Sequence, residues 1–331
     1  MLHLADPHRD NQGLYGRWTG VPFALAYGLI THLVFQPNDD YWGLVSLGFL
    51  VGVPFVLGLI TMLLARSQCE TPLTAIALPW ITCILYLAIL IGAQVEAFIC
   101  VCLALPLVFG MSSLGGLFTC ALMKFRGRAP SNSRFLGLFI FLPYLFAPLE
   151  GQWTPPTTSY IVNTEIVINA PVEVVWQNII RVPAIQTWER RPAFFTTIGL
   201  PYPIEATLSG EGNGNVRHAS FEDGLLFIET VTNWETNRVI GFTIEADKSQ
   251  PLPVHLQMID SPYFEVVNGG YRLEPLTDGR VLLHLSSQHE VTTTFNWYAG
   301  LWTRLIMQDI QTNILQIVKT RSESLAEHFV P

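Results

Sequence analysis

The chain has 331 residues, of which 50% are hydrophobic and 13% are charged, whereas an average soluble domain has about 25% charged residues. This deficit excludes an ordinary soluble enzyme. Residues 1–149 carry a net charge of +1, and residues 150–331 carry −9. The division predicts a membrane region followed by an acidic domain that is long enough to bury a core. Neither part offers the basic face that binding the phosphates of a nucleic acid requires, so we do not expect the chain to bind nucleic acid.

The first 149 residues contain four apolar segments that meet or approach the roughly 20 residues a helix needs to cross a bilayer. A fifth segment has 15 residues. It reaches roughly 22 Å and crosses only where the bilayer thins or flanking residues anchor it. We therefore expect four to five transmembrane helices. The segments are Trp18–Phe35, Gly43–Ala65, Pro72–Ala93, Ala97–Met123 and Phe135–Leu149.

Basic residues predict the side on which the acidic domain lies, because Lys and Arg concentrate in cytoplasmic loops. They stand before the first segment, between the second and third, and before the fifth. With five crossings, which we favour, the acidic domain is extracytoplasmic, as in a bacterial inner-membrane protein. With four crossings it is cytoplasmic. The basic residues are Arg9, Arg17, Arg66, Lys124, Arg126, Arg128 and Arg134, and the remaining loops carry Asp39, Asp40 and Glu96.

Two ionisable residues of the membrane region are functional candidates, because burying such groups in a bilayer is costly. Glu96 is the only charged residue between Thr71 and Met123, and it falls in a tight turn. His32 stands three residues before the end of the first segment. We interpret both as interfacial residues rather than as a site.

The pattern changes after a turn-rich linker, residues 150–159, to that of an α+β domain over residues 160–329. A first strand leads into a helix, 172–180, and a long amphipathic helix over 296–327 closes the chain. Between them we expect six strands, several of them separated by glycine-rich turns. The first strand is Tyr160–Ile168, and the six that follow the helix are Ile204–Leu208, Val216–Phe221, Leu225–Trp234, Val239–Glu245, Tyr263–Leu273 and Val281–Val291.

This order of elements resembles the START-like superfamily, also called polyketide cyclase and lipid-transport-like or SRPBCC. Residues 168–176, 210–218 and 270–279 carry the resemblance, which covers 160–329. The chain is most similar to a bacterial subfamily of unestablished activity in which membrane helices precede such a domain. The resemblance implies a helix-grip fold, in which a curved antiparallel sheet wraps around the long helix and encloses an apolar cavity.

The last helix carries one apolar stripe at helical spacing. Most residues of such a stripe pack in the hydrophobic core. If the domain encloses the implied cavity, part of the stripe also covers that cavity. Tyr298 and Trp302 are our candidates for ligand contact. The stripe comprises Tyr298, Leu301, Trp302, Leu305, Ile306, Ile310, Ile314 and Ile317.

Three polar residues complete the set of candidate ligand contacts. His289 shares the inward phase of strand 281–291 with apolar residues, whereas His284 has the opposite phase. Arg217 and His218 follow a glycine-rich turn that a ligand headgroup could approach. Neighbours in a strand face opposite sides, so at most one of them points inward. An ion pair between Arg217 and Glu229 is the competing interpretation.

Motifs for phosphate binding, zinc binding or an activated nucleophile are missing from the sequence. All five cysteines lie in the first part and lack metal-ligand spacing. We therefore expect no cofactor and no metal. The favoured hypothesis is a membrane-anchored, non-enzymatic protein that binds or transfers a lipid, isoprenoid or polyketide-like molecule. A cyclase or hydratase using His289 with an acidic neighbour, and a sensory or structural membrane protein, are the alternatives. The sequence does not identify a protein partner.

Overall fold

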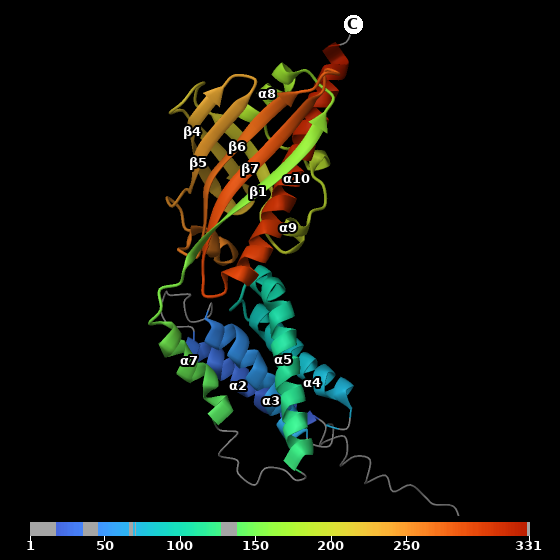
Figure 1. Ribbon diagram of the computed structural model, residues 1–331, viewed down its shortest axis with the longest axis vertical. Helices are drawn as coiled ribbons and strands as arrows, with labels where there is room; N and C mark the ends of the chain where they lie inside the picture. The colour runs from blue at the N-terminus through green and yellow to red at the C-terminus, as the bar shows by residue number, and fades with distance from the viewer. Residues whose placement is uncertain (1–17, 36–45, 66–68, 70, 127–137, 330–331) are drawn as a thin grey trace, which may run out of the picture. The chain divides into compact units, whose positions relative to one another are not determined.

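The computed structural model describes residues 18–35, 46–65, 69, 71–126 and 138–329 (Figure 1). The chain divides into two compact units, Met1–Thr154 and Pro155–Pro331. Several residues of the topology prediction lie outside the described residues: Arg9, Arg17, Asp39, Asp40, Arg66, Arg128 and Arg134.

The described part of the first unit is helical, because its segments are almost continuously apolar. Two helices, Pro72–Gly92 and Phe98–Lys124, are long and apolar enough to cross a membrane, and three apolar helices are shorter. The elements are α2 (Gly20–Phe35), η2 (Gly48–Gly52) running into α3 (Val53–Leu64), α4 (Pro72–Gly92), α5 (Phe98–Arg126) and α7 (Leu142–Glu150).

Helices α3 and α5 approach each other closely through glycines. A Cβ atom on Gly58 would lie 2.0 Å from the carbonyl oxygen of Ser112, and one on Gly115 would lie 2.0 Å from that of Phe55. Glycine at both positions therefore permits backbone contact, as is common between membrane helices.

A disulfide joins Cys69 to Cys120 of α5. Spacing alone does not reveal such a pairing, and the sequence did not predict it. Cys83, Cys100 and Cys102 are free thiols.

Contacts between α2 and the segment 138–150 establish that both run in the same direction. The Tyr27 hydroxyl donates to the carbonyl oxygen of Ile140 over 2.9 Å. One turn further along both helices, the hydroxyls of Thr31 and Tyr144 are 2.6 Å apart. The first and last described helices of this unit are therefore parallel.

Glu150, at the end of α7, caps the helix that continues into α3. Its carboxylate oxygens accept hydrogen bonds from the backbone N–H groups of Leu47 (2.8 Å) and Gly48 (3.1 Å). The C-terminal end of α7 and the N-terminal end of the η2–α3 helix therefore lie at the same end of the bundle.

The second unit has a seven-stranded antiparallel sheet in the order β1-β7-β6-β5-β4-β3-β2 and a long C-terminal helix, the expected helix-grip arrangement (Figure 1). Strand β1 begins three residues earlier than predicted, because Thr157 pairs with Thr292. The elements are β1 (Thr157–Ile168), α8 (Val172–Ile180), η4 (Thr187–Glu189), α9 (Phe194–Thr197), β2 (Pro203–Leu208), β3 (Val216–Phe221), η5 (Glu222–Gly224), β4 (Leu226–Glu235), β5 (Val239–Ala246), η6 (Val254–Asp260), β6 (Phe264–Pro275), β7 (Val281–Thr292) and α10 (Asn296–Phe329).

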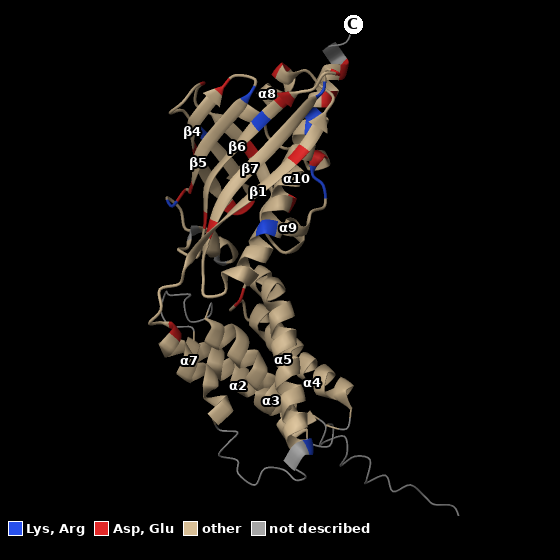
Figure 2. Cartoon of the chain, viewed as in Figure 1, with Lys and Arg blue, Asp and Glu red and all other residues tan. Residues whose placement is uncertain are grey.

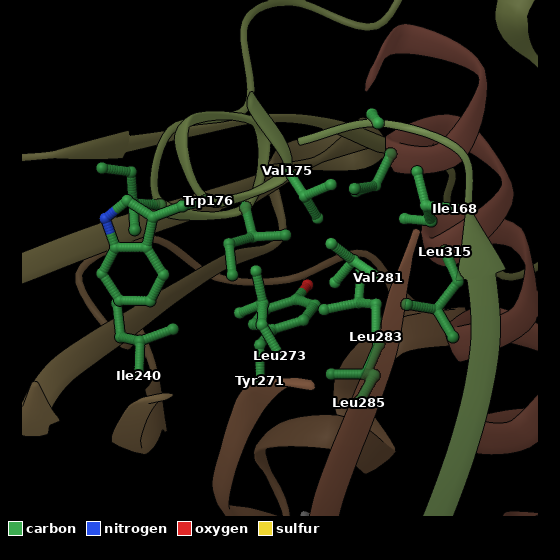
Figure 3. Close-up of a cluster of buried hydrophobic side chains, with 14 of the residues drawn as sticks. Ile168, Val175, Trp176, Ile240, Tyr271, Leu273, Val281, Leu283, Leu285 and Leu315 are labelled. Carbon is green, nitrogen blue, oxygen red and sulfur yellow. The ribbon is translucent and has the colours of Figure 1, made fainter. Parts of the chain in front are cut away.

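The apolar core of this unit lies between the inner face of the sheet, α8 and the second half of α10 (Figure 3). Trp176 of α8, Leu283 of β7 and Leu315 of α10 are almost completely buried there. Trp176 also packs edge to face on Trp234, with ring centroids 5.1 Å apart.

The apolar stripe expected along α10 is not buried as one surface. Ile306 and Ile317 are buried, whereas Leu301 and Leu305 are each 46% exposed. In the second half of the helix Leu315 and Val318, which lie outside the expected stripe, are buried instead. The predicted stripe was therefore wrong at Leu301 and Leu305, and it omitted Leu315 and Val318. The buried face of a long helix changes because a different element packs against each turn.

Candidate functional site

His289 lies on the inner face of β7 and is fully buried. Every second residue of β7, from Val281 to Val291, is buried, so the alternation assigned from the sequence holds. His284 has the opposite phase, and its ring nitrogens lie 3.3 Å and 3.6 Å from carboxylate oxygens of Glu165 and Glu274. The pleat of β7 thus separates an interior histidine from one at the outer surface.

The His289 ring is held by aromatic neighbours and by one hydroxyl. It stacks on Tyr160 of β1, with centroids 5.6 Å apart, and lies 5.6 Å from the ring of Phe264. Its Nε2 is 2.9 Å from the hydroxyl of Thr303 on α10. The buried Nδ1 makes no hydrogen bond with any residue in the described part of the chain. His289 therefore presents one uncommitted polar atom within apolar surroundings.

Burial lowers the pKa of His289 to about 4, and the positive charge of Arg304 adds to the effect. The imidazole is therefore neutral at pH 7, with one nitrogen as donor and the other as acceptor. A group with this pKa is a weak general base at neutral pH. Its electronic state suits a hydrogen bond to a ligand better than proton abstraction.

Tyr298 and Trp302, the two candidates on α10, lie together beside Thr303. Their ring centroids are 6.4 Å apart, and Trp302 also stacks on Phe194 of α9 at 6.3 Å. The indole Nε1 of Trp302 is buried, and no described residue accepts a hydrogen bond from it. The first half of α10 thus carries a second uncommitted polar atom, on the residue immediately before the one that contacts His289.

Arg217 also faces inward, but it is occupied by other residues. It forms an ion pair with Glu229, its direct partner on β4, and its Nη2 donates to the carbonyl oxygen of Ile179 over 3.4 Å. The guanidinium carbon lies 5.6 Å from the Phe242 ring centroid. His218, the next residue, is exposed on the other face of the sheet. The ion pair with Glu229, which was the alternative to a ligand role for Arg217, is therefore present.

The candidate residues do not form one site. Arg217 is on β3 and His289 on β7, four strands apart in the sheet, which corresponds to roughly 19 Å at the usual spacing between strands. His289 is linked to α10 through Thr303, the residue that follows Trp302, whereas the rings of Tyr298 and Trp302 contact each other. Arg217 belongs to a separate buried cluster that includes Tyr271.

Sequence reasoning missed Tyr160, Thr303 and Gln311 as neighbours of the inner face. The Gln311 amide donates to the carbonyl oxygen of Val162 (3.1 Å) and to the hydroxyl of Ser287 (2.8 Å). The alternation of β1 contained a signal for Tyr160, which pairs directly with His289. Thr303 and Gln311 of α10 had no such signal in the sequence. Within the described ranges, no group of three or more His, Cys, Asp or Glu residues could hold a metal ion.

No protein-family model and no curated protein matches the chain. Among solved structures it is similar to a START superfamily protein from Mycobacterium smegmatis, with 13% identity over 50% of this chain and 98% of that chain, at a TM-score of 0.34. It is also similar to truncated norcoclaurine synthase from Thalictrum flavum (12% identity, 50% and 93% coverage, TM-score 0.31). A third similarity is to the Zhui aromatase/cyclase from Streptomyces sp. R1128 (14% identity, 52% and 99% coverage, TM-score 0.33).

Proposed function

We propose that this chain is a membrane-anchored protein whose C-terminal unit binds or transfers a hydrophobic small molecule, such as a lipid, isoprenoid or polyketide-like compound. The observation that carries the proposal is the buried, neutral His289, whose Nδ1 is uncommitted among aromatic rings. Small-molecule sites are mostly apolar with few oriented polar groups. Buried polar atoms otherwise find partners within the fold.

The two halves of α10 support locating this site beside the first half of the helix. The second half packs into the main core through Leu315 and Val318. The first half instead carries the uncommitted Nε1 of Trp302 and the hydroxyl that contacts His289.

A cyclase or hydratase in the same place is the second candidate. Such an enzyme needs a base with a pKa near the working pH. Among the described residues, the hydrogen-bonding and ring partners of His289 are Thr303, Tyr160 and Phe264, and none of them is a carboxylate. The pKa of about 4 therefore favours binding over proton transfer.

Five crossings are supported by the helix directions in the first unit. The parallel pair α2 and 138–150, together with the Glu150 cap, suits an odd number of passes. This proposal makes the C-terminal unit extracytoplasmic. The Cys69–Cys120 disulfide counts against this assignment. It lies near Lys124, at the end of the helices that the positive-inside rule assigns to the cytoplasm, and disulfides are rare in the cytoplasm. A reporter fused after Pro331 that is active only in the cytoplasm would reverse the assignment.

The ligand proposal is tested by two variants of the full chain in detergent, using a fluorescent hydrophobic probe and mass spectrometry of co-purifying lipids. Trp302→Ala should change probe affinity, and its loss of unfolding free energy should stay below the roughly 3–5 kcal/mol typical of a packed core aromatic. His289→Leu should weaken binding, because it removes the uncommitted Nδ1 that is available to a ligand. Trp188→Ala, at an exposed tryptophan of η4, is the control. A core-sized loss for Trp302→Ala with binding unchanged in both variants would contradict the proposal.

A further inference from the structure

An exposed apolar surface lies at the start of α10, adjoining the candidate site. Trp297 is 71% exposed, and Leu301 and Leu305 are each 46% exposed. Residues four apart on a helix share one side. We call the surface formed by these three residues with Phe194, Tyr298 and Trp302 the aromatic face.

The aromatic face is continuous. The rings of Trp297 and Tyr298 are 5.6 Å apart, those of Tyr298 and Trp302 6.4 Å, and those of Trp302 and Phe194 6.3 Å. Phe194 is itself 42% exposed. Contiguous exposed apolar surface of this kind marks an interaction site rather than scattered surface residues.

The charge around the aromatic face differs from that of the domain that carries it. Residues 150–331 have a net charge of −9, yet Arg304 is the only charged residue between Val291 and Gln308. In Figure 2 the ribbon of the first turns of α10 is almost entirely tan, the colour of uncharged residues. Arg304 is exposed and lies on the same turns as Leu301 and Leu305. The Asp309 carboxylate, one turn beyond Leu305, accepts a hydrogen bond from the backbone N–H of Phe195, so the Arg304 cation is the charge available to a phosphate-bearing headgroup layer.

The start of α10 is tied to the chain segment that follows α7. Asn296, which precedes Trp297, donates from Nδ2 to the carbonyl oxygen of Pro156 over 2.6 Å and to the hydroxyl of Thr158 over 2.8 Å. Helix α7 ends at Glu150. Five residues lie between Glu150 and Pro156, and the six steps from one to the other span at most roughly 22 Å in a fully extended chain.

We infer that the aromatic face docks on the bilayer surface, with Trp297, Leu301 and Leu305 in the interfacial layer and Arg304 among the headgroups. The inference rests on the membrane anchoring of the proposed function. Tryptophan and tyrosine concentrate at this depth because their rings are apolar and their polar atoms reach water. Helices with one apolar face lie in the interface by burying that face. Docking brings Trp302 and Thr303, and through them His289, next to the lipid from which a hydrophobic ligand would come.

The test uses the full chain in nanodiscs of phosphatidylcholine and phosphatidylglycerol, with and without brominated phosphatidylcholine, which quenches tryptophan at bilayer depth. The emission of Trp297 is obtained as the difference between wild type and Trp297→Phe. Trp188 is the matched control, since it is 78% exposed in the same unit. Its neighbour Glu189 binds Arg321, which lies roughly 36 Å from Trp297 along α10 at 1.5 Å per residue.

We expect the Trp297 emission to be blue-shifted, quenched by the brominated lipid and protected from iodide in the aqueous phase. The Trp188 emission should show the reverse. Quenching of Trp297 by iodide and not by lipid would overturn the inference. Protection of Trp297 from both quenchers would also overturn it, because a protein surface, such as a second copy of the chain, would then cover the aromatic face.

Ligand binding is measured separately, so that the docking inference and the proposed ligand-binding function can fail independently. Leu301→Asp with Leu305→Asp should slow transfer of a fluorescent phospholipid from donor vesicles to the protein severalfold. The affinity of the detergent-solubilised chain for the same phospholipid should stay unchanged. Lipid quenching of Trp297 without phospholipid binding leaves docking valid and refutes the ligand proposal. Phospholipid binding with Trp297 open to iodide refutes docking alone.

Discussion

Arg217 and Glu229 stand directly opposite each other on β3 and β4 and form an ion pair on the inner face of the sheet. Both residues are buried, at 4% and 7% exposure. Tyr271 of β6 joins them, and burial raises the pKa of its phenol. A pair buried to this extent is far more sensitive to the loss of one partner than to the loss of both.

The first prediction follows from that asymmetry. Glu229→Leu should lower the unfolding free energy by about 3–5 kcal/mol, because it leaves a buried guanidinium without a carboxylate to balance its charge. Arg217→Met combined with Glu229→Leu should recover most of the loss. Urea denaturation of the full chain in detergent, followed by circular dichroism, provides the measurement. Arg272→Met, which breaks an exposed pair with Glu274, should cost less than about 1 kcal/mol. A double variant as unstable as Glu229→Leu would contradict this account.

A second prediction concerns acid stability. The pKa of His289 is about 4 in the folded chain, against an ordinary value of 6.5. Between these values the unfolded chain binds more protons, so the contribution of neutral His289 is complete above pH 6.5 and is lost as the pH falls toward 4. Unfolding curves over this range should depend less on pH in His289→Gln than in wild type. His218→Gln, at an exposed histidine, should keep the wild-type slope. Equal slopes in all three proteins would count against a neutral, buried His289.

The third prediction addresses the helix cap in the first unit. Glu150→Leu removes the acceptor for the N–H groups of Leu47 and Gly48, and loss of a helix cap costs about 0.5–2 kcal/mol. Glu150→Gln keeps one acceptor oxygen and should lose less. Unfolding by sodium dodecyl sulfate from a mild detergent measures both. Equal stability of Glu150→Leu and wild type would show that the cap contributes nothing.

The fourth prediction counts thiols. The chain has five cysteines, of which two form the Cys69–Cys120 disulfide and three are free. Maleimide added to the denatured, unreduced protein should therefore give three adducts, and five after reduction. Cys69→Ser frees Cys120 and should give four adducts without reductant. Five adducts on the unreduced wild type would mean that the two sulfurs are not joined.

The sequence alone determined where most elements begin and end. Helix α8 and strand β3 span the predicted residues, because capping, turns and periodicity act over a few neighbouring positions. The inward phase of His289 was predictable for the same reason, since alternation along one strand requires no knowledge of its partner. The ion pair of Arg217 with Glu229 could be anticipated as a possibility because both residues lie in adjacent strands of a hairpin.

Only the tertiary structure decided which surfaces meet. The Glu150 cap joins residues more than 100 positions apart, and Tyr160 reaches the start of α10 across 136 positions. No local pattern encodes such contacts. The same holds for the Cys69–Cys120 pairing and for the exposure of Leu301 and Leu305, whose helical spacing is that of buried residues. The spacing of apolar residues in a helix shows which of them share a side. Their burial depends on which other elements of the chain pack against each turn.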